Sequence, residues 1–384
     1  MEKTEKTTAA MAIVQCLLRE GIDHVWGIPG TQNLPLLDAL RATPQIRFVL
    51  TRHEQGAAFM ALGYARAAGR PAIVTATEGP GVTNLATGIA AAYKGYVPVI
   101  SISGLQEEHV RDRDANQDIA QTTFFRPITK WAHTIPSAAK AQEAIRRAFR
   151  IALAEPLGPV HIDASRDVLL EETAIEPVPP SAYRVQTLPD CAPAALDEAM
   201  TLLSTAERPL LVVGAGVLRE GLTAAVEALA NSSGIPVATL QYVPDAYPTT
   251  CTGALGMLGR NGWGSANQAA PQADVIVAIG AHIDYYSSTF RYGVFSKDAK
   301  IVHHTADATD VGVVYPVAQA LTGSTRSFVA GLKERIERSG RRWEWLDVTK
   351  AREDWQKQRN TGTEAAVPLP GPFVAKPMRD ALPR

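Results

Sequence analysis

The first 170 residues alternate between two patterns of apolar positions. Short runs of consecutive apolar residues are typical of buried strands, and the stretches between them carry an apolar residue every three or four positions, which is typical of amphipathic helices. This alternation predicts a parallel sheet covered by helices on both faces, an α/β fold. The apolar runs predict strands at residues 24–28, 46–50, 72–76, 97–103 and 160–163.

The same alternation returns in the second half of the chain. An apolar run over residues 208–217 leads into a glycine turn, and further runs follow at 235–240, 274–280 and 300–304. Between the two halves the chain is rich in proline and lacks periodicity, as a linker does. We predict two doubly wound parallel-sheet domains at residues 1–170 and 193–340, a linker at 171–192, and a C-terminal helix and tail at 341–384.

The composition narrows the classes of protein. The chain has 384 residues, 46% of them hydrophobic, and a formal net charge of -1. The balanced charge argues against a nucleic-acid partner or a polybasic membrane surface, and no apolar run is long enough to span a bilayer. Three scattered cysteines are too few for a disulfide framework or a zinc site. We expect a cytoplasmic protein that binds neither nucleic acid nor membrane.

Three loops of the first predicted sheet fall at the carboxyl ends of strands, where such sheets bind ligands. They are residues 28–30, 53–54 and 77–81. Glu54 lies between a strand and a helix, so it could cap the helix or belong to a site. Gly79 and Gly81 let a backbone approach a ligand closely. Together the three loops predict a site at this edge.

The stretch between residues 105 and 125 is polar and poorly periodic. It contains Asp114, Asn116, Gln117 and Asp118, and from these residues alone it could be a solvated loop. Its interpretation depends on the motifs that flank it.

Four motifs occur in a recognisable order and spacing. They are Gly27–Gly30, Arg52–Ala57, Gly79–Leu85 and Phe125–Lys130. With them the chain resembles the pyrimidine-binding domain of thiamine-diphosphate enzymes, in particular the acetohydroxyacid (acetolactate) synthase branch. The resemblance continues to about residue 335 and includes the central, Rossmann-like domain of that family.

The resemblance implies roles for individual residues. Glu54 matches the glutamate that hydrogen-bonds the aminopyrimidine of the cofactor and so activates it by acid–base catalysis. A carboxyl held away from water would have a raised pKa, which suits a shared proton. Gln117 matches a glutamine that reaches the reacting centre, so the polar stretch becomes an active-site loop. The residues implied to line the pyrimidine pocket are Pro29, Gly30, Pro80 and Asn84.

Glu78 departs from the synthase pattern, where a small polar residue is usual at the matching position. We group it with the cofactor-binding residues. A second carboxylate near Glu54 would raise a pKa or pair with a substrate cation, and the side chain could equally point to solvent.

The second domain shows no intact dinucleotide fingerprint. Gly214 and Gly216 follow a strand, but the third glycine, Gly221, comes too late, and the next strand ends in Gln241 instead of an acid. The arginines that hold FAD in the synthases are replaced by His282 and Tyr286. We therefore expect neither NAD nor FAD to bind.

From the resemblance we expect the diphosphate half of the cofactor site to be missing from this sequence. The Gly-Asp-Gly signature of the third, diphosphate-binding domain occurs nowhere, so we expect no metal ligands here. The resemblance implies thiamine diphosphate and Mg²⁺, with the Mg²⁺ ligands on a missing domain or a separate subunit. It also implies a hetero-oligomer built on a homodimer.

The sequence thus predicts a subunit or fragment of a thiamine-diphosphate enzyme that forms or cleaves a carbon–carbon bond next to a carbonyl. The reaction would be carboligation, or decarboxylation or lyase chemistry, on a 2-oxo acid or 2-hydroxyacyl compound. One alternative is a non-catalytic regulatory or scaffolding subunit of such a complex. The other is a nucleotide-binding oxidoreductase, which the faulty fingerprint disfavours.

Overall fold

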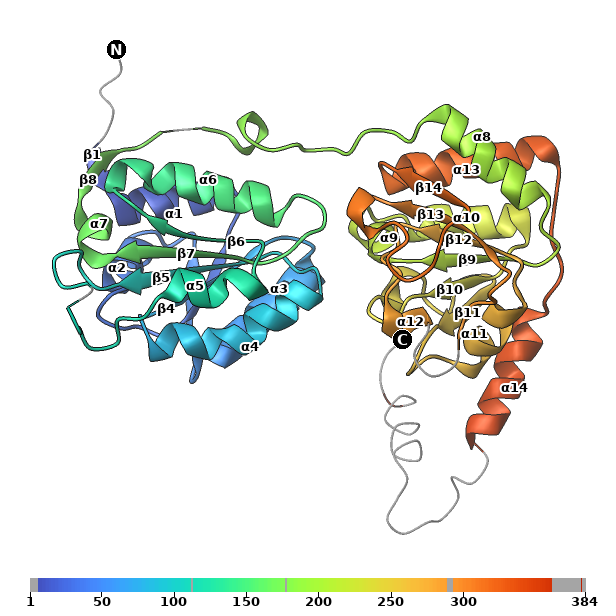
Figure 1. Ribbon diagram of the computed structural model, residues 1–384, viewed down its shortest axis with the longest axis horizontal. Coiled ribbons are helices and arrows are strands. Elements are labelled where there is room, and N and C mark those ends of the chain that lie inside the picture. Colours follow the sequence, from blue (N-terminus) through green and yellow to red (C-terminus); the bar gives the residue numbers. More distant parts are fainter. Residues whose placement is uncertain (1–5, 112, 177, 289–292, 361–380, 382–384) are drawn as a thin grey trace, which may run out of the picture. The chain divides into compact units, whose positions relative to one another are not determined.

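The chain forms two compact units, residues 1–186 and 187–384. A computed structural model describes residues 6–111, 113–176, 178–288, 293–360 and 381 (Figure 1). Each unit has its own six-stranded sheet and its own hydrophobic core, as the two predicted parallel-sheet domains require. The units are described separately below.

The first unit is built on a wholly parallel sheet. Its central strands consist almost entirely of buried residues because helices cover both faces. The predicted apolar runs all form strands of this sheet. In spatial order the strands are β3 (Arg47–Leu50), β2 (His24–Gly27), β4 (Ala72–Ala76), β5 (Val99–Leu105), β7 (Val160–Ser165) and β6 (Trp131–Ile135).

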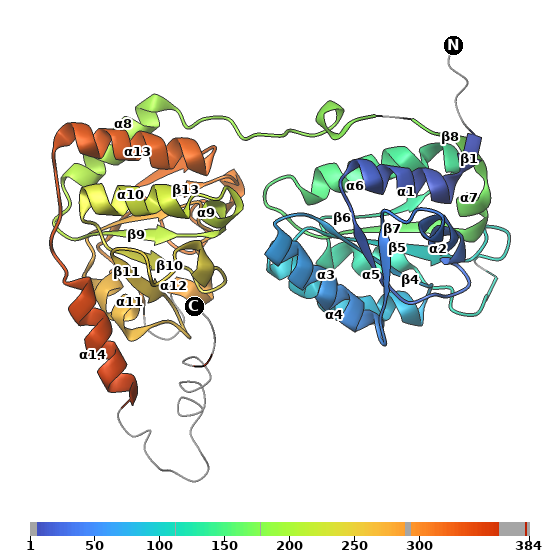
Figure 2. The same cartoon turned by 180° about the vertical axis from the view of Figure 1, so that it is seen from behind.

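Seven α-helices flank this sheet among the described residues of the first unit. One core cluster joins α1, α2, α6 and α7 to one face, and another joins α3, α4 and α5 to the opposite face (Figures 1 and 2). The helices are α1 (Ala9–Arg19), α2 (Leu34–Arg41), α3 (Glu54–Ala68), α4 (Pro80–Lys94), α5 (Gln121–Phe125), α6 (Ala141–Ala152) and α7 (Arg166–Leu170).

Two features of the first unit were not predicted. The edge strand β6 was missed because its residues 131–134 are only half-buried and include His133 and Thr134, so no continuous apolar run marks it. The other feature is a small antiparallel pair, β1 (Lys6–Thr8) with β8 (Glu172–Ala174). Residues beyond β8 still contact the first unit, because the Tyr183 hydroxyl hydrogen-bonds to the buried carboxylate of Glu20.

The second unit repeats the architecture. All of its neighbouring strands are parallel, and the order is β11 (Ala254–Met257), β10 (Val237–Thr239), β9 (Pro209–Val213), β12 (Val275–Ile279), β13 (Lys300–Thr305) and β14 (Gln319–Thr322). Its α-helices are α8 (Pro193–Ser204), α9 (Ala215–Arg219), α10 (Thr223–Ser233), α11 (Gly264–Ala269), α12 (Tyr285–Ser288), α13 (Thr325–Ser339) and α14 (Val348–Asn360).

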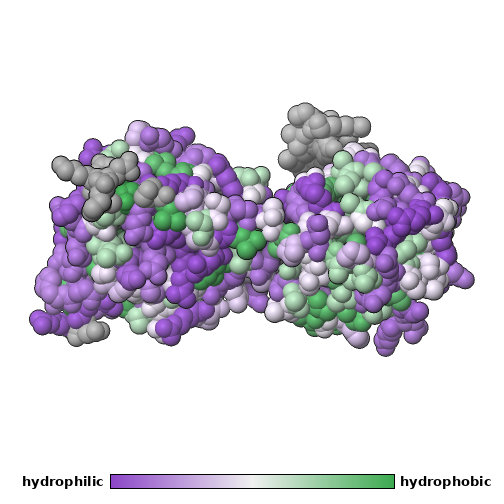
Figure 3. Space-filling model, turned by 90° about the horizontal axis from the view of Figure 1, so that it is seen from above, coloured by the Kyte–Doolittle hydropathy of each residue, from purple (hydrophilic) through white to green (hydrophobic). Residues whose placement is uncertain are grey.

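The predicted C-terminal helix is α14. It packs on α11 of the same unit, where the rings of Trp355 and Trp263 stack with centroids 4.5 Å apart. The proline-rich part of the predicted tail lies outside the described residues. Among the described residues, no helix combines the length and apolar character needed to cross a bilayer. The face of the molecule in Figure 3 is largely hydrophilic, with smaller hydrophobic areas between.

Helices α3 and α4 approach each other unusually closely. A Cβ atom added to Gly88 of α4 would lie 2.4 Å from the Cβ of Ala58 in α3. The facing side of α3 is lined by the buried alanines Ala57, Ala58, Ala61 and Ala65, which leave room for this contact. Glycine at position 88 is therefore a packing requirement, because any side chain would separate the two helices.

We expect Gly88→Ala to destabilise the first unit by about 1–3 kcal/mol, the usual cost of overpacking a core. The matched control is Gly63→Ala in α3, where an added Cβ would have nothing within 4 Å. That substitution should stabilise by about 0.5–1 kcal/mol, because alanine is the better helix former. Urea unfolding of both variants measures the difference. Equal effects of the two substitutions would show that the α3–α4 contact is not tight.

Candidate functional site

The loops at the carboxyl edge of the first sheet are locked together through small residues. A Cβ added to Gly30 would lie 2.3 Å from the Cβ of Thr77, so the loop after β2 packs directly on the loop after β4. Thr77 Oγ1 hydrogen-bonds Gln32 Oε1 at 2.7 Å across the same junction. Two of the three predicted site loops are thus in direct contact.

Asn33 holds the first of these loops in shape. Its Oδ1 accepts a hydrogen bond from the Gly30 amide at 2.8 Å, and its Nδ2 donates to Ile28 O at 3.1 Å. The same Nδ2 lies 3.2 Å from Thr75 Oγ1 on β4. Pro29, between these anchored residues, is exposed at the edge of the sheet.

Glu54 is the first residue of α3 and is buried. The residue that caps the helix is His53, whose Nδ1 accepts from the Gln55 amide at 3.1 Å. The reading of Glu54 as the capping residue is therefore wrong. Glu54 Oε2 instead accepts from Asn84 Nδ2 at 3.0 Å, and no described residue hydrogen-bonds its Oε1. A Cβ added to Gly81 would lie 3.5 Å from this free oxygen.

The contact between α3 and α4 explains why Glu54 meets Asn84. Glu54 precedes Ala58 by four residues, and Asn84 precedes Gly88 by four residues. Four residues are about one helical turn, so both side chains lie one turn before the close contact, on the facing sides of their helices. The packing of two small residues thus sets the position of the buried carboxylate.

Gln117 lies against the same edge. It is exposed and has a positive φ of 71°, an uncommon conformation for a non-glycine residue. A Cβ added to Gly79 would lie 2.7 Å from Gln117 O. Gly79 itself has a φ of 62°. The polar stretch therefore packs on the Gly79–Gly81 turn, and the structure brings together the two segments that carry Gln117 and Pro80.

Glu78 does not point to solvent. It is fully buried, and neither of its oxygens has a hydrogen-bond partner of normal geometry among the described residues. Burial raises the pKa of Glu78 to about 7, and the carboxylates of Asp118 and Asp163 act in the same direction. The Gln106 backbone amide and the Arg111 guanidinium only partly oppose this rise. The carboxyl faces the protein interior.

A buried polar network under the site was not predicted. Asp163 Oδ1 accepts from Ser103 Oγ at 2.7 Å and from Gln121 Nε2 at 2.6 Å, and it lies 2.8 Å from His161 Nε2. Ser101 Oγ lies 2.7 Å from His161 Nδ1. The sequence signal was available, because polar residues at alternate positions of two apolar strands face the same side of a sheet.

This network does not form a hydrolytic triad. Ser101, His161 and Asp163 are all buried, so no substrate can reach the serine hydroxyl. The ring is also reversed relative to a Ser-His-Asp triad, because Nδ1 faces the serine and Nε2 faces the aspartate. The network instead links β5, β7 and α5 through buried hydrogen bonds.

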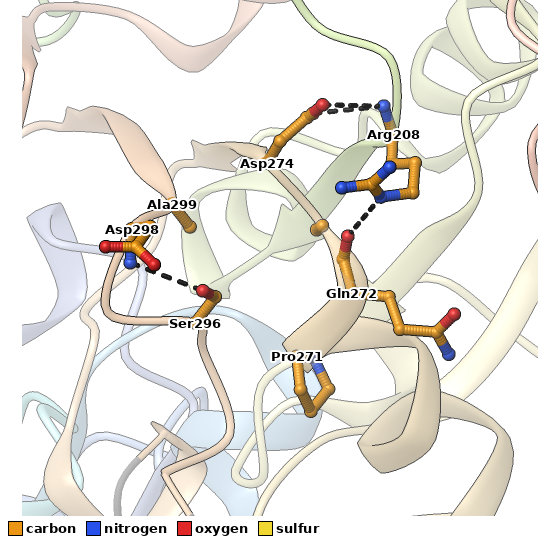
Figure 4. A pocket seen from close by; sticks show the side chains of 8 residues that line it. Arg208, Pro271, Gln272, Asp274, Ser296, Asp298 and Ala299 are labelled. Atoms are coloured by element: carbon orange, nitrogen blue, oxygen red, sulfur yellow. Dashed lines mark hydrogen bonds between the residues drawn. The ribbon is translucent and has the colours of Figure 1, made fainter.

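A pocket of the second unit lies at the amino-terminal edge of its sheet, where the strands begin. It is lined by residues just before β9, β12 and β13 (Figure 4). Its polar groups already bond to one another, since Asp274 accepts from the Arg208 amide and Arg208 Nε donates to Gln272 O at 2.7 Å. Ligands of α/β sheets bind at the carboxyl ends of strands, so this pocket is not the candidate site.

The glycine turn of the second unit is closed by its own backbone. The amides of Gly214 and Gly216 donate to Ile279 O at 3.0 Å and to Gly280 O at 2.8 Å. A Cβ added to Gly214 would lie 2.4 Å from the Cα of Ala281. Two amides of the turn that could otherwise face a nucleotide phosphate are therefore occupied.

The histidines of the second unit also have protein partners. His282, at a position where the synthases have an arginine, pairs through Nδ1 with the Asp310 carboxylate. His303 hydrogen-bonds Ala281 O, and His304 bonds Gly280 N and Gly323 O. The described part of the chain holds no group of three or more His, Cys, Asp or Glu residues suited to a metal ion.

The raised pKa of Glu78 predicts a pH-dependent stability. Its ordinary value is 4.5 and its value in the folded chain is about 7. Between these values the folded chain binds more protons than the unfolded chain, so stability falls as the pH rises from 4.5 to above 7. Glu78→Gln removes this loss. Its stability relative to the unsubstituted chain should increase between pH ~5 and pH ~8.5 by on the order of 2–3 kcal/mol, at ~1.4 kcal/mol per pKa unit.

Urea unfolding at the two pH values measures this effect. Glu171→Gln, at an exposed position of the same unit, is the control and should show no such change. A difference in stability between Glu78→Gln and the unsubstituted chain that stays constant with pH would contradict the raised pKa of Glu78.

Comparison with known proteins supports the resemblance in both units. Residues 7–124 match the model of the thiamine pyrophosphate enzyme N-terminal TPP binding domain, and residues 196–332 match that of the thiamine pyrophosphate enzyme central domain. Both matches fall on the two sheet units described above.

Individual relatives agree with the family match. The chain is 38% identical over 310 residues to a probable acetolactate synthase large subunit of Methanocaldococcus jannaschii, covering 79% of this chain and 52% of the relative. It is 34% identical to the acetolactate synthase large subunit of Corynebacterium glutamicum, covering 90% and 56%. For the isozyme 1 large subunit of Escherichia coli the identity is also 34%, covering 89% and 60%.

The chain thus spans between half and two thirds of the length of these relatives. The two family matches cover both of its sheets, and the buried Glu54 with its Asn84 partner lies within the first of them. We conclude that the chain belongs to the thiamine pyrophosphate enzymes, of which it carries the N-terminal and central domains.

Proposed function

We propose that this chain supplies the pyrimidine-binding half of the active site of a thiamine-diphosphate-dependent carboligase or lyase of the acetolactate synthase type. The substrate would be a 2-oxo acid or a related 2-hydroxyacyl compound. The observation that carries the proposal is Glu54, a buried carboxylate that is oriented by Asn84 and has one free oxygen facing the Gly81 cradle.

The residues at this edge fit an aminopyrimidine ring. A Cβ at Gly81 would fill the space beside Glu54 Oε1, so glycine leaves room for a flat ring there. Glu54 Oε1 would share a proton with a ring nitrogen, while Asn84 fixes the other oxygen. When bound, thiamine diphosphate supplies a carbon nucleophile that makes or breaks bonds beside a carbonyl group.

Other residues of the edge complete the proposed site. Pro29, Gly30 and Pro80 would form walls of the pyrimidine pocket, and Gln117 would contact the reacting groups. Glu78 is enclosed by the protein, so we assign it to the support of the Gly79–Gly81 turn, without direct contact to substrate.

The diphosphate and Mg²⁺ would be held by other polypeptide, because the described residues contain no suited ligand cluster. Relatives of this chain are named large subunits, which supports a hetero-oligomeric assembly. Phe59, Met60 and Tyr93 expose apolar side chains on α3 and α4. We propose that this surface, together with Pro29, is the homodimer face of that assembly.

The activity can be tested by assaying 2-oxo acid turnover with and without a partner that carries a diphosphate-binding domain. We expect turnover only in the complete assembly. There, Glu54→Gln should lower turnover by about 10²–10⁴, the range for a positioned acid–base group. Glu171→Gln, at an exposed position, should retain full turnover.

Two results would contradict this function. One is a Glu54→Gln variant with unchanged turnover in the assembly. The other is a complete assembly that binds no thiamine diphosphate, which would favour a regulatory or scaffolding subunit.

A second prediction concerns flavin. Because the Gly214 and Gly216 amides are already bonded and His282 pairs with Asp310, the assembly should work without added FAD. The purified protein should be colourless, without the visible absorbance of a bound flavin. A yellow preparation with stoichiometric flavin would show that other residues bind the pyrophosphate.

A further inference from the structure

Gln121 connects two segments of the proposed site. It is the first residue of α5 and is 1% exposed. Its Oε1 accepts from the Gly79 amide at 2.9 Å, and its Nε2 donates to Asp163 Oδ1 at 2.6 Å. One side chain therefore ties the turn after β4 to the buried network on β7.

These partners settle the orientation of the amide. The Gly79 N–H can only donate, so it requires the Gln121 oxygen, and the Asp163 carboxylate accepts, so it requires the Gln121 nitrogen. A glutamine amide meets both requirements with one neutral side chain at any pH.

The same residue anchors the loop that carries Gln117. Gln121 follows Gln117 by four residues, and its own amide donates to Ile119 O at 2.8 Å. The other end of this loop is held by Gln106, whose Nε2 donates to Asn116 O at 3.0 Å. Gln117 keeps its positive φ between these two anchors and packs on Gly79. Such a conformation persists only where its surroundings hold it.

We propose that Gln121 is a positioning residue of this site, which uses Gly79 and Asp163 to hold the Gly79–Gly81 turn and the Gln117 loop in a single arrangement. Its consequence for turnover rests on the proposed function. The arrangement itself does not, because it is defined by hydrogen bonds within this chain.

The first test compares amide hydrogen exchange of the folded Gln121→Met variant with that of the unsubstituted chain. This substitution keeps the length of the side chain and removes both hydrogen bonds. The Gly79 amide should lose protection by about tenfold, the effect of one lost hydrogen bond. Peptides spanning residues 106–120 should also exchange faster.

The matched control is Gln142→Met. Gln142 is 2% exposed and makes the same pair of bonds elsewhere in the unit, donating to Ala174 O at 2.7 Å and accepting from the Glu176 amide at 2.9 Å. The Gln142→Met variant should lose a comparable free energy of unfolding and leave the exchange protection of the Gly79 amide unchanged. Equal changes at Gly79 in both variants, or none in Gln121→Met, would overturn the proposal.

A third variant, Gln121→Glu, makes the protection of the Gly79 amide depend on pH, an effect that general destabilisation would not produce. The introduced carboxyl keeps an acceptor for Gly79 but faces the Asp163 carboxylate, with His161, Glu78 and Asp118 as the other titratable groups nearby. Two adjacent carboxyls share a proton at low pH. Protection of Gly79 should therefore be lost at neutral pH and recover on acidification. No recovery at a pH where the chain remains folded would count against the proposal.

In the complete assembly, Gln121→Met should lower kcat by about tenfold or more relative to Gln142→Met, with a smaller effect on the KM for substrate. An unchanged kcat would overturn the positioning role of Gln121 in the site. If the unsubstituted assembly has no turnover, the proposed function fails, while the exchange of Gly79 still decides whether Gln121 holds the turn.

Discussion

The close approach of α3 and α4 is the contact on which the proposed site depends. Gly88 meets Ala58 with no space for another carbon atom, and one turn earlier the same two helix faces bring Asn84 to Glu54. A buried carboxylate needs a hydrogen-bond donor to offset its desolvation. Here the packing of α3 on α4 supplies Asn84 as that donor, so Glu54 and the core residues Ala58 and Gly88 belong to one helix–helix contact.

Two buried acids beneath the site have opposite environments. Asp163 has three polar neighbours at one oxygen, Ser103, Gln121 and His161, whereas Glu78 has no partner of normal geometry among the described residues. Burial without hydrogen bonds raises the pKa of a carboxyl, as it does for Glu78. The same residue class thus serves as a hydrogen-bond acceptor in one place and as a carboxyl with a raised pKa in the other.

The second unit shows that the fold alone does not make a site. It has the same sheet type and a glycine turn at the carboxyl end of β9, yet Ile279 O and Gly280 O accept the amides of that turn, and Ala281 packs against it. The glycines permit close packing of backbone on backbone. In the first unit, the corresponding edge instead presents Gly81 beside a free carboxylate oxygen. Function has to be argued from such local differences.

Sequence alone determined the two parallel sheets, five of the six strands of the first one and the edge that carries Glu54 and Pro80, because buried strands and glycine turns leave local patterns. The assignment of Gln117 to that edge came from the family resemblance. Only the tertiary structure decided that Glu78 faces inward and that Gln121 reaches the Gly79 amide. The partners of Gln121 lie 42 positions away along the chain. Strand register and helix packing decide which side chains meet over such separations, and the local pattern of apolar residues predicts neither.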